Sequence, residues 1–290
     1  MKFGSPYTTT DHRKFNTWCK WTKRLDTYGR GCEHDCNYCY AKSLLSFRNL
    51  WDNKNPAIAD GCDVSKAVKS LQKYDVVRLG KMTDCFQPIE LKERATYNAI
   101  LWLNKYKINY LIVTKSHHVI RDEYLEIYDL DLAHFQITIT STDDIVALDY
   151  EKCSVISKRI EAIEKLQRLG YDVSVRLSPL IEKNIDFEIL NVIRCDKILV
   201  EFLKVNHWIK KWFDIDYSKY TLKYGGYNNL ELDDKIRILR KVTGFKEVTV
   251  GEYVLQHHEY FSEQVNHNPY DCCNLTIKNE VDKQQQLTFF

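Results

Sequence analysis

The chain has 290 residues, of which 44% are hydrophobic and 28% are charged, and its formal net charge is 42 − 40 = +2. This composition suits one large globular domain, or one domain with an extension, and the small net charge excludes a globally basic field. No apolar run approaches the roughly 18 residues of a membrane span, and the N-terminus lacks a signal-peptide core, so we expect a cytoplasmic protein. Its ten cysteines then indicate metal ligands or chemistry rather than a disulfide framework.

Short β-branched segments alternate with amphipathic helices along most of the chain. After a short strand candidate at 25–31, strands are predicted at 76–80, 110–115, 135–140, 173–178 and 197–202. Helices are predicted at 91–106 and 152–170. Strands that are apolar along their whole length and alternate with helices predict an α/β fold. Its parallel sheet would be either open or curled into a partial barrel.

The helix at 152–170 has the clearest pattern. Its predicted apolar stripe consists of Ile156, Ile160, Ile163, Leu166 and Leu169. Gly170 follows at the position where a left-handed residue commonly ends a helix.

Polar residues stand just past several of the predicted strands. Because ligands collect at the carboxyl ends of parallel strands, these residues are candidates for a binding site. They are Thr83, Asp84, Lys115, Ser116, Thr138, Thr140, Arg176, Ser178 and Glu201.

Three cysteines, Cys32, Cys36 and Cys39, lie within eight residues in the segment "RGCEHDCNYCYA". A disulfide uses two thiols and a closed zinc site uses four N or S ligands. The adjacent Cys272 and Cys273 do not form the second C-x2-C pair of a zinc ribbon. An iron–sulfur cube held by three thiolates keeps one iron open for an exogenous ligand. The glycines and charges around the three thiols are not typical of a hydrophobic core.

This C-x3-C-x2-C segment resembles the cluster motif of radical S-adenosylmethionine (SAM) enzymes. The resemblance implies a [4Fe–4S] cluster on the three cysteines, with SAM chelated by the open iron and cleaved to a 5′-deoxyadenosyl radical. It also implies a partial (β/α)6 barrel, which we place at residues 1–205, and a C-terminal extension at 206–290 that caps the barrel or the substrate site. A ferredoxin or flavodoxin would supply the electron.

A narrower resemblance, to the spore photoproduct lyase-like family, covers most of residues 20–200. It rests on "NYCYA", "TDxxQPIE", "VTKS" followed by "RDEYL", "FQITITSTDD" and "SVISKRIEAIEKLQRLGYDVSVRLSPLI". The lyase repairs a methylene-bridged thymine dimer in DNA and uses a cysteine to return the hydrogen atom. The resemblance therefore implies a DNA or nucleotide substrate.

The resemblance also implies roles for individual residues. Lys115 matches a lysine that meets the SAM carboxylate, and Thr138 matches a serine directed toward the same methionine group. Thr83 and Asp84 are candidate contacts to cofactor or substrate, and Arg176 is a candidate ligand for a carboxylate or a phosphate.

The hydrogen donor departs from the family pattern. Alignment on Asp84 places Lys81 where the lyase has its donor cysteine, and Cys85 lies on the other side of the aspartate. Cys85, Tyr38 and Tyr40 are therefore the candidate catalytic residues, and spore photoproduct itself is not the expected substrate. A thymine lesion or modified pyrimidine in DNA is the leading hypothesis. The alternatives are a peptide or small metabolite, or a non-catalytic iron–sulfur or zinc adaptor.

The last ninety residues are less informative. The segment 256–275 is rich in histidine and cysteine, which raises a second metal site as an alternative to a simple cap. Residues 204–212 interleave lysines with tryptophans, a composition that suits stacking on nucleobases and neutralising phosphates, but also an ordinary amphipathic segment.

Overall fold

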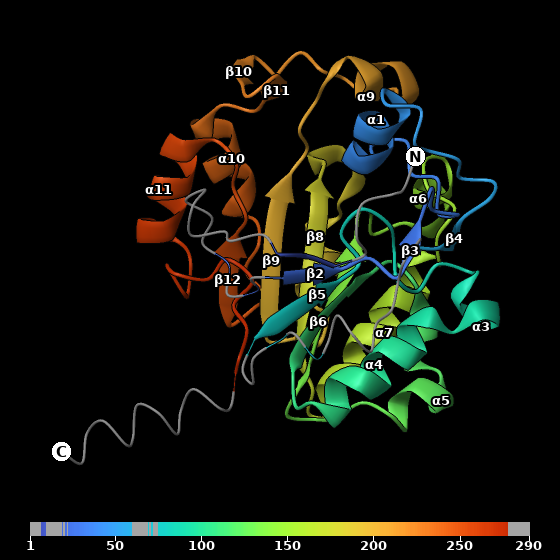
Figure 1. Cartoon of the computed structure of the whole chain (residues 1–290). Helices are drawn as coiled ribbons and strands as arrows, with labels where there is room; N and C mark the ends of the chain where they lie inside the picture. The colour runs from blue at the N-terminus through green and yellow to red at the C-terminus, as the bar shows by residue number, and fades with distance from the viewer. Residues whose placement is uncertain are drawn as a thin grey trace.

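The structure, a computed structural model, describes residues 7–9, 19, 21, 23–59, 69, 71 and 75–277. Its main sheet has eight strands (Figure 1). In spatial order they are β1 (Tyr7–Thr9), β2 (Lys23–Leu25), β5 (Val76–Leu79), β6 (Asn109–Thr114), β7 (Ala133–Ile139), β8 (Asp172–Leu180), β9 (Lys197–Phe202) and β12 (Glu247–Val250). Only β1 pairs antiparallel in this sheet, and all the other neighbours pair in parallel.

Two small antiparallel strand pairs and a set of helices complete the described fold. One pair is β3 (Tyr28–Gly29) with β4 (Ala57–Ile58), and the other is the hairpin of β10 (Leu222–Tyr224) and β11 (Tyr227–Asn229). The helices are α1 (Tyr40–Ser46), α3 (Glu90–Glu93), α4 (Ala95–Lys105), α5 (Asp122–Leu125), α6 (Asp144–Leu148), α7 (Ile156–Arg168), α8 (Phe187–Asn191), α9 (His207–Trp212), α10 (Leu232–Leu239) and α11 (Leu255–Gln264). Among the described residues, no helix combines the length and apolar character that a membrane crossing requires.

The five predicted strands from 76–80 to 197–202 are confirmed as β5 to β9, and the α/β class is confirmed with them. With β2 they form the six parallel strands expected of the partial barrel. β12 adds a seventh, from the region predicted as a capping extension. The described part of the predicted extension, residues 206–277, therefore contributes a strand to the sheet as well as the helices beside it.

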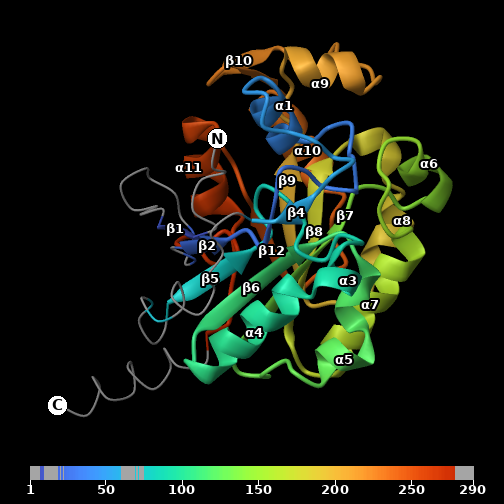
Figure 2. The same ribbon diagram turned by 45° about the vertical axis from the view of Figure 1, so that its right-hand side comes forward.

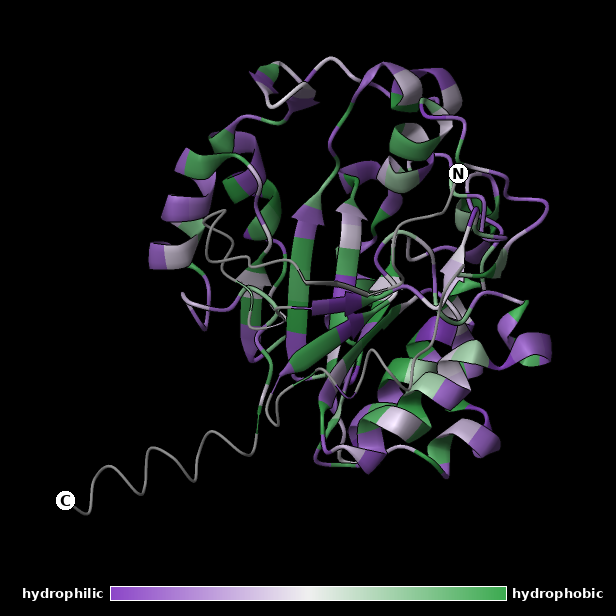
Figure 3. Ribbon diagram, in the orientation of Figure 1, coloured by the Kyte–Doolittle hydropathy of each residue, from purple (hydrophilic) through white to green (hydrophobic). Residues whose placement is uncertain are grey.

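Side chains on the two faces of the sheet have different partners. Alternate residues such as Ile112, Ile137 and Val175 pack against the helices in one large hydrophobic core. Figure 2 shows α4, α5 and α7 along this side, and Figure 3 shows that β8 and β9 are hydrophobic along most of their length. We call the opposite side the inner face; it carries polar residues such as Gln136 and Arg176, which are buried.

Two predicted elements differ from the structure in detail. The helix predicted at 91–106 is divided, because Arg94 adopts a left-handed conformation (φ 53°) between α3 and α4. In α7 the predicted stripe is partly wrong, since Leu169 is exposed while Arg159 and Ala162 are buried. Gly170 does adopt the left-handed conformation expected after this helix (φ 85°).

The strand candidate at 25–31 is also divided. Its beginning belongs to β2 of the main sheet, and Tyr28 and Gly29 form β3, which pairs with β4 outside that sheet. Between them, the Asp26 carboxylate accepts hydrogen bonds from the backbone N–H groups of Lys81 and Met82, both at 2.9 Å. This contact connects the segment between β2 and β3 to the loop that follows β5.

Candidate functional site

The three predicted ligand cysteines lie on one loop, residues 32–39, which we call the cluster loop. It runs from β3 to α1 at the carboxyl end of the sheet (Figure 1). Cys32 and Cys36 are buried, while Cys39 is half-buried and accepts a hydrogen bond at its Sγ from the Lys42 N–H (3.4 Å) as the N-cap of α1. The three thiols do not all lie within 4.8 Å of one another. That separation does not suit four-coordinate zinc, whose sulfur ligands lie about 2.3 Å from a single ion.

Backbone contacts fix the cluster loop against two segments of the barrel. The Glu33 N–H donates to Gln87 Oε1 (2.9 Å) in the loop after β5. On the other side, the Asn37 N–H donates to the Tyr150 carbonyl (2.9 Å), and the His34 carbonyl accepts from the Lys152 N–H (2.7 Å).

A close approach before the loop requires glycine. A Cβ built on Gly31 would lie 2.2 Å from the backbone oxygen of Asp52, so any side chain there would displace the backbone. The loop is thus positioned by its hydrogen bonds to Gln87, Tyr150 and Lys152 and by the close approach of Gly31 to Asp52.

Asp84 connects the loop after β5 to the end of β6. Its carboxylate accepts from Thr114 Oγ1 (2.6 Å) and the Lys115 N–H (2.7 Å), and it lies 3.3 Å from His34 Nε2. Burial opposes ionisation, but His34 and these hydrogen bonds hold the pKa of Asp84 well below its usual range. Thr83 donates to the Tyr28 carbonyl (2.8 Å). The structure therefore gives both residues contacts that position the cluster loop.

Glu90, in the same "TDxxQPIE" motif, organises the start of α4. Its buried carboxylate accepts from the N–H groups of Thr96 (2.9 Å) and Tyr97 (2.8 Å). These two groups lie in the first turn of α4, where backbone N–H groups have no hydrogen-bond partner within the helix. The Tyr124 hydroxyl (2.6 Å) and the Tyr28 hydroxyl also donate to it. Sequence reasoning assigned no role to this residue.

A buried ionic network lies directly behind the cluster loop. Glu151 accepts from Tyr38 Oη and from Arg159 Nη2, and Thr140 Oγ1 donates to it at 2.9 Å. Arg159 also donates through Nη1 to the Thr138 carbonyl (3.1 Å). Burial raises the pKa of the Glu151 carboxyl, but Arg159 and Lys115 lower it more, so its pKa lies below the usual value. Tyr38, a candidate catalytic residue, therefore has its hydroxyl committed to a carboxylate.

Lys115 is the cation left over at this edge. Its Nζ lies 5.7 Å from the centre of the Tyr38 ring, and no carboxylate among the described residues lies within 4.0 Å of it. Burial lowers the pKa of Lys115, but its interactions with Cys36, Cys153 and Glu151 raise the pKa by more than that. The net pKa lies above the usual value, so the ammonium stays protonated. A half-buried cation with no ion-pair partner suits an incoming carboxylate.

Arg176 is engaged with other residues of the inner face. Its Nη1 donates to Gln136 Oε1 (2.6 Å) and its Nη2 to Glu201 Oε2, while Ser178 Oγ donates to the same carboxylate oxygen (2.7 Å). Arg176 therefore already has an ion-pair partner within the protein.

The structure does not bring the remaining candidate residues to one point. Cys85 directly follows Asp84 in the chain, but its side chain is 0% exposed and packs in the large hydrophobic core. Tyr40 is 44% exposed and donates to the Lys81 carbonyl at 2.8 Å. Thr138 is buried on the inner face of β7, opposite Arg176 of β8.

One thiol near the cluster loop was missed. Cys153 lies 3.9 Å from Cys36 (Sγ to Sγ), and Glu151 lies 4.0 Å from the same sulfur. Cys36 and Cys153 are 117 residues apart in sequence, so no local spacing indicates this contact. The burial of Arg159 was weakly indicated by the sequence, because this residue lies between apolar positions of α7.

Helix α9 brings cations and aromatic rings to the rim of the cluster loop. It lies beside α1 in both Figure 1 and Figure 2, and Asn206 Nδ2 donates to Ser43 Oγ (3.2 Å). The Lys42 ammonium lies 5.0 Å from the centre of the Trp212 ring, and the ring centres of Trp208 and Trp212 are 5.6 Å apart. The predicted lysine–tryptophan segment is therefore next to the site.

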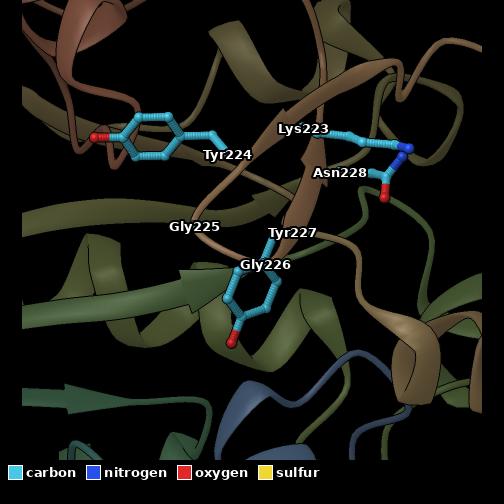
Figure 4. Close-up of a pocket in the computed structure, with 6 residues that line it drawn as sticks. All are labelled: Lys223, Tyr224, Gly225, Gly226, Tyr227 and Asn228. Carbon is cyan, nitrogen blue, oxygen red and sulfur yellow. The ribbon is translucent and has the colours of Figure 1, made fainter.

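A hollow of about 310 Å³ lies along the β10–β11 hairpin (Figure 4). It is lined by Lys223, Tyr224, Gly225, Gly226, Tyr227 and Asn228. None of the predicted site residues lines it, so it does not add to the candidate site.

Comparison with known proteins gives a partial sequence relative. No model of a known protein family matches the chain. An uncharacterized protein of Methanocaldococcus jannaschii is 26% identical over 159 residues, which are 54% of this chain and 60% of that protein. The match thus spans less than two thirds of the relative's length.

Comparison of structures identifies the fold. A spore photoproduct lyase variant superposes with a TM-score of 0.62 at 17% identity, over 81% of this chain and 77% of that one. A second variant, with bound AdoMet and dinucleoside spore photoproduct, gives 0.58 at 18% identity over 83% and 80%. Streptococcus suis SuiB, bound to precursor peptide SuiA, gives 0.52 at 11% identity over 86% and 53%. The chain has the partial-barrel fold of radical SAM enzymes, of the spore photoproduct lyase type.

Proposed function

We propose that this chain is a radical SAM enzyme that holds a [4Fe–4S] cluster on Cys32, Cys36 and Cys39. The observation that carries the proposal is the cluster loop itself, with three separated thiols fixed at the carboxyl end of the sheet beside the unpaired ammonium of Lys115. Three thiolates suit a four-iron cube that keeps one iron open. When bound, the cluster supplies the electron that cleaves SAM and yields a 5′-deoxyadenosyl radical.

In this proposal the protein's own residues bind and orient the cofactors. Lys115 receives the SAM carboxylate, because its charge has no partner among the described residues. The Thr138 hydroxyl lies on the same edge and contacts the methionine group. The Glu151–Arg159 pair fixes Tyr38 and the segment that holds the cluster loop. Asp84 fixes the backbone of Lys115.

We further propose that the substrate is a nucleobase, specifically a modified pyrimidine or thymine lesion in DNA. The support is the fold shared with a lyase whose structure contains a dinucleoside spore photoproduct, together with the position of α9. Exposed Lys210 and Lys211 can neutralise phosphates, and the Trp208–Trp212 pair can stack on a base.

Spore photoproduct itself is not the preferred substrate in this proposal. Lys81 occupies the expected donor position, and Cys85, the nearest candidate thiol, is buried in the core. Incubation of the reduced enzyme with spore photoproduct in an oligonucleotide tests this. We expect SAM cleavage without repair; reversion to two thymines that is lost in Cys85→Ala would show that Cys85 is the donor.

The activity is tested on protein purified anaerobically. We expect about four iron and four sulfide per chain, an electron paramagnetic resonance signal after reduction, and dithionite-dependent cleavage of SAM to 5′-deoxyadenosine. Zinc bound at the cluster loop, with no iron after reconstitution, would contradict the proposed enzyme activity and would favour a zinc-binding adaptor.

The substrate class is tested by binding across a salt series. Affinity for single- or double-stranded DNA that falls with rising salt supports a nucleic acid, since phosphate contacts release counterions. No binding at low salt, together with SAM turnover on a peptide, would assign the peptide class that SuiB represents.

A further inference from the structure

A second group of three thiols lies where the two ends of the described chain meet. Cys19, Cys272 and Cys273 place their Sγ atoms within 4.8 Å of one another, and the Cys19 and Cys272 sulfurs are 3.0 Å apart. All three are free cysteines. We call this group the terminal thiol trio.

The trio borders a small apolar cluster on the inner face. Cys273 packs with Val76, Leu111 and Val113 of the sheet, and Cys19 and Cys272 pack against the same cluster. The cluster is completed by Trp21, Leu275 and Ile277. The thiols are therefore held between the sheet and two chain segments that are 253 residues apart.

Two basic side chains lie beside Trp21 of the same apolar cluster. The guanidinium carbon of Arg78 lies 5.3 Å from the centre of the Trp21 ring, and its Nε is buried without a hydrogen-bond partner among the described residues. The Lys81 ammonium lies 4.9 Å from the same ring. Thiolates on a metal ion would bring negative charge close to these two cations, and neutral thiols would not.

The trio is separate from the cluster loop but connected to the inner-face polar residues. The Cys273 carbonyl accepts from Gln136 Nε2 (3.4 Å), and Gln136 in turn accepts from Arg176. No cluster-loop cysteine belongs to the group.

We propose that the terminal thiol trio is a second metal site, and that its occupant is Zn²⁺. Three clustered thiolates are the ligands that soft and borderline metal ions prefer, and zinc needs no redox partner to bind them. A disulfide between Cys19 and Cys272 would use two of the thiols and leave Cys273 unexplained. No fourth histidine, cysteine or carboxylate among the described residues joins the group, so water completes the tetrahedron.

The bound ion has a structural consequence for the fold. It ties residue 19 to residues 272–273 and so closes the apolar cluster over the inner face. Because the site does not exist in the unfolded chain, the free energy of metal binding adds to the stability of the folded protein.

The test measures metal content of the full chain, purified anaerobically and incubated with Zn²⁺. We expect about one zinc per chain in addition to iron, and thiolate-to-metal charge-transfer absorption when Co²⁺ replaces Zn²⁺. Mutation of a residue that only supports a metal ligand already costs about 10- to 100-fold in metal affinity. Cys272 and Cys19 are ligands themselves in this proposal, so Cys272→Ser and Cys19→Ser should each weaken Zn²⁺ binding by more than about tenfold.

Control variants separate this site from the cluster loop. Cys195→Ser changes a buried thiol that donates only to the backbone oxygens of Val173 (3.5 Å) and Lys197 (3.4 Å), and should retain zinc. Cys32→Ala should also retain it. Iron content and SAM cleavage in Cys272→Ser show that the variant is folded.

Two results would overturn the proposal. One is zinc lost in Cys32→Ala but kept in Cys272→Ser, which would place the ion at the cluster loop and also contradict the proposed function. The other is no zinc in the wild type and a Cys19–Cys272 disulfide in peptide mass spectra, which would leave the proposed function intact.

Discussion

The cluster loop and the terminal thiol trio each collect three cysteines, but they do so in different ways. The cluster loop takes its thiols from eight consecutive residues, and its backbone forms hydrogen bonds to the backbone of Tyr150 and Lys152 and to the side chain of Gln87. The trio takes one thiol, Cys19, from the N-terminal part of the chain and two adjacent thiols, Cys272 and Cys273, from the C-terminal part. Its thiols are further held by apolar packing and lie nearer together.

This difference in spacing teaches what each group suits. Separated thiols on a single loop leave space between them for a multi-iron cube, and closely grouped thiols suit a single ion. The thiols of the cluster loop are close in sequence, whereas the trio exists only after residues 19 and 272 have met.

The largest expected effect separates the two groups completely. Cys32→Ala removes one of three cluster ligands and should abolish iron binding and SAM cleavage, because two thiolates do not hold the cube. Cys272→Ser should keep both. Iron analysis and 5′-deoxyadenosine formation measure this; equal loss of iron in both variants would join the two groups into one site.

The polar networks behind the two regions should differ in energy. Arg159→Met leaves Glu151 buried without its cation, and removal of one partner of a buried pair costs about 3–5 kcal/mol. Both side chains are at most 1% exposed. We expect urea unfolding to show this loss.

The matched variant on the trio's side is Lys197→Met. Lys197 donates to Asp172 (2.8 Å), the Asn274 carbonyl (2.9 Å) and Thr276 (2.5 Å), and so attaches the C-terminal segment. Its partners are less buried, and we expect a loss of about 1–3 kcal/mol. A larger loss than in Arg159→Met would reverse the ranking of the two networks.

A smaller effect tests the cation beside the cluster loop. Hydrogen bonds to charged groups contribute about 1.5–3 kcal/mol, so Lys115→Ala should weaken SAM binding by about 10- to 150-fold. Lys107→Ala, which removes an exposed lysine paired with Asp129, is the control and should bind SAM normally. Unchanged SAM affinity in Lys115→Ala would remove this residue from the site.

The smallest effect concerns Lys81, beside the trio. Burial, with help from Arg78 and Arg24, lowers the pKa of Lys81 to about 8. The unfolded chain then binds more protons than the folded one above pH 8, so this group makes stability rise with pH from about 8 toward its usual pKa. Lys81→Met should remove that rise. Unfolding free energies of both proteins at pH 7 and pH 9 measure it; parallel pH profiles would contradict the assignment.

Local patterns in the sequence predicted the strands β5 to β9 and the cysteine motif, because continuous apolar runs and ligand spacing involve neighbouring residues. The position of Lys115 at a strand end followed from the same reasoning. The Glu151–Arg159 pair was missed, since a charged residue on a buried helix face is indicated only by its partner. Likewise, no spacing connects Cys36 to Cys153, or Cys19 to Cys272. Whether Thr138 and Lys115 contact SAM stays a prediction.

The segment at 271–277 has a consequence for biosynthesis. It covers the inner face through Cys273, Leu275 and Ile277, and Lys197 and Asp172 hold it there. Translation produces β5 to β9 before this segment, so on the nascent chain Leu111 and Val113 lack the part of their cover that Cys273, Leu275 and Ile277 provide. Such exposed apolar surface attracts chaperones and promotes aggregation. The native inner face is therefore completed late in synthesis, after every strand of the sheet has been made.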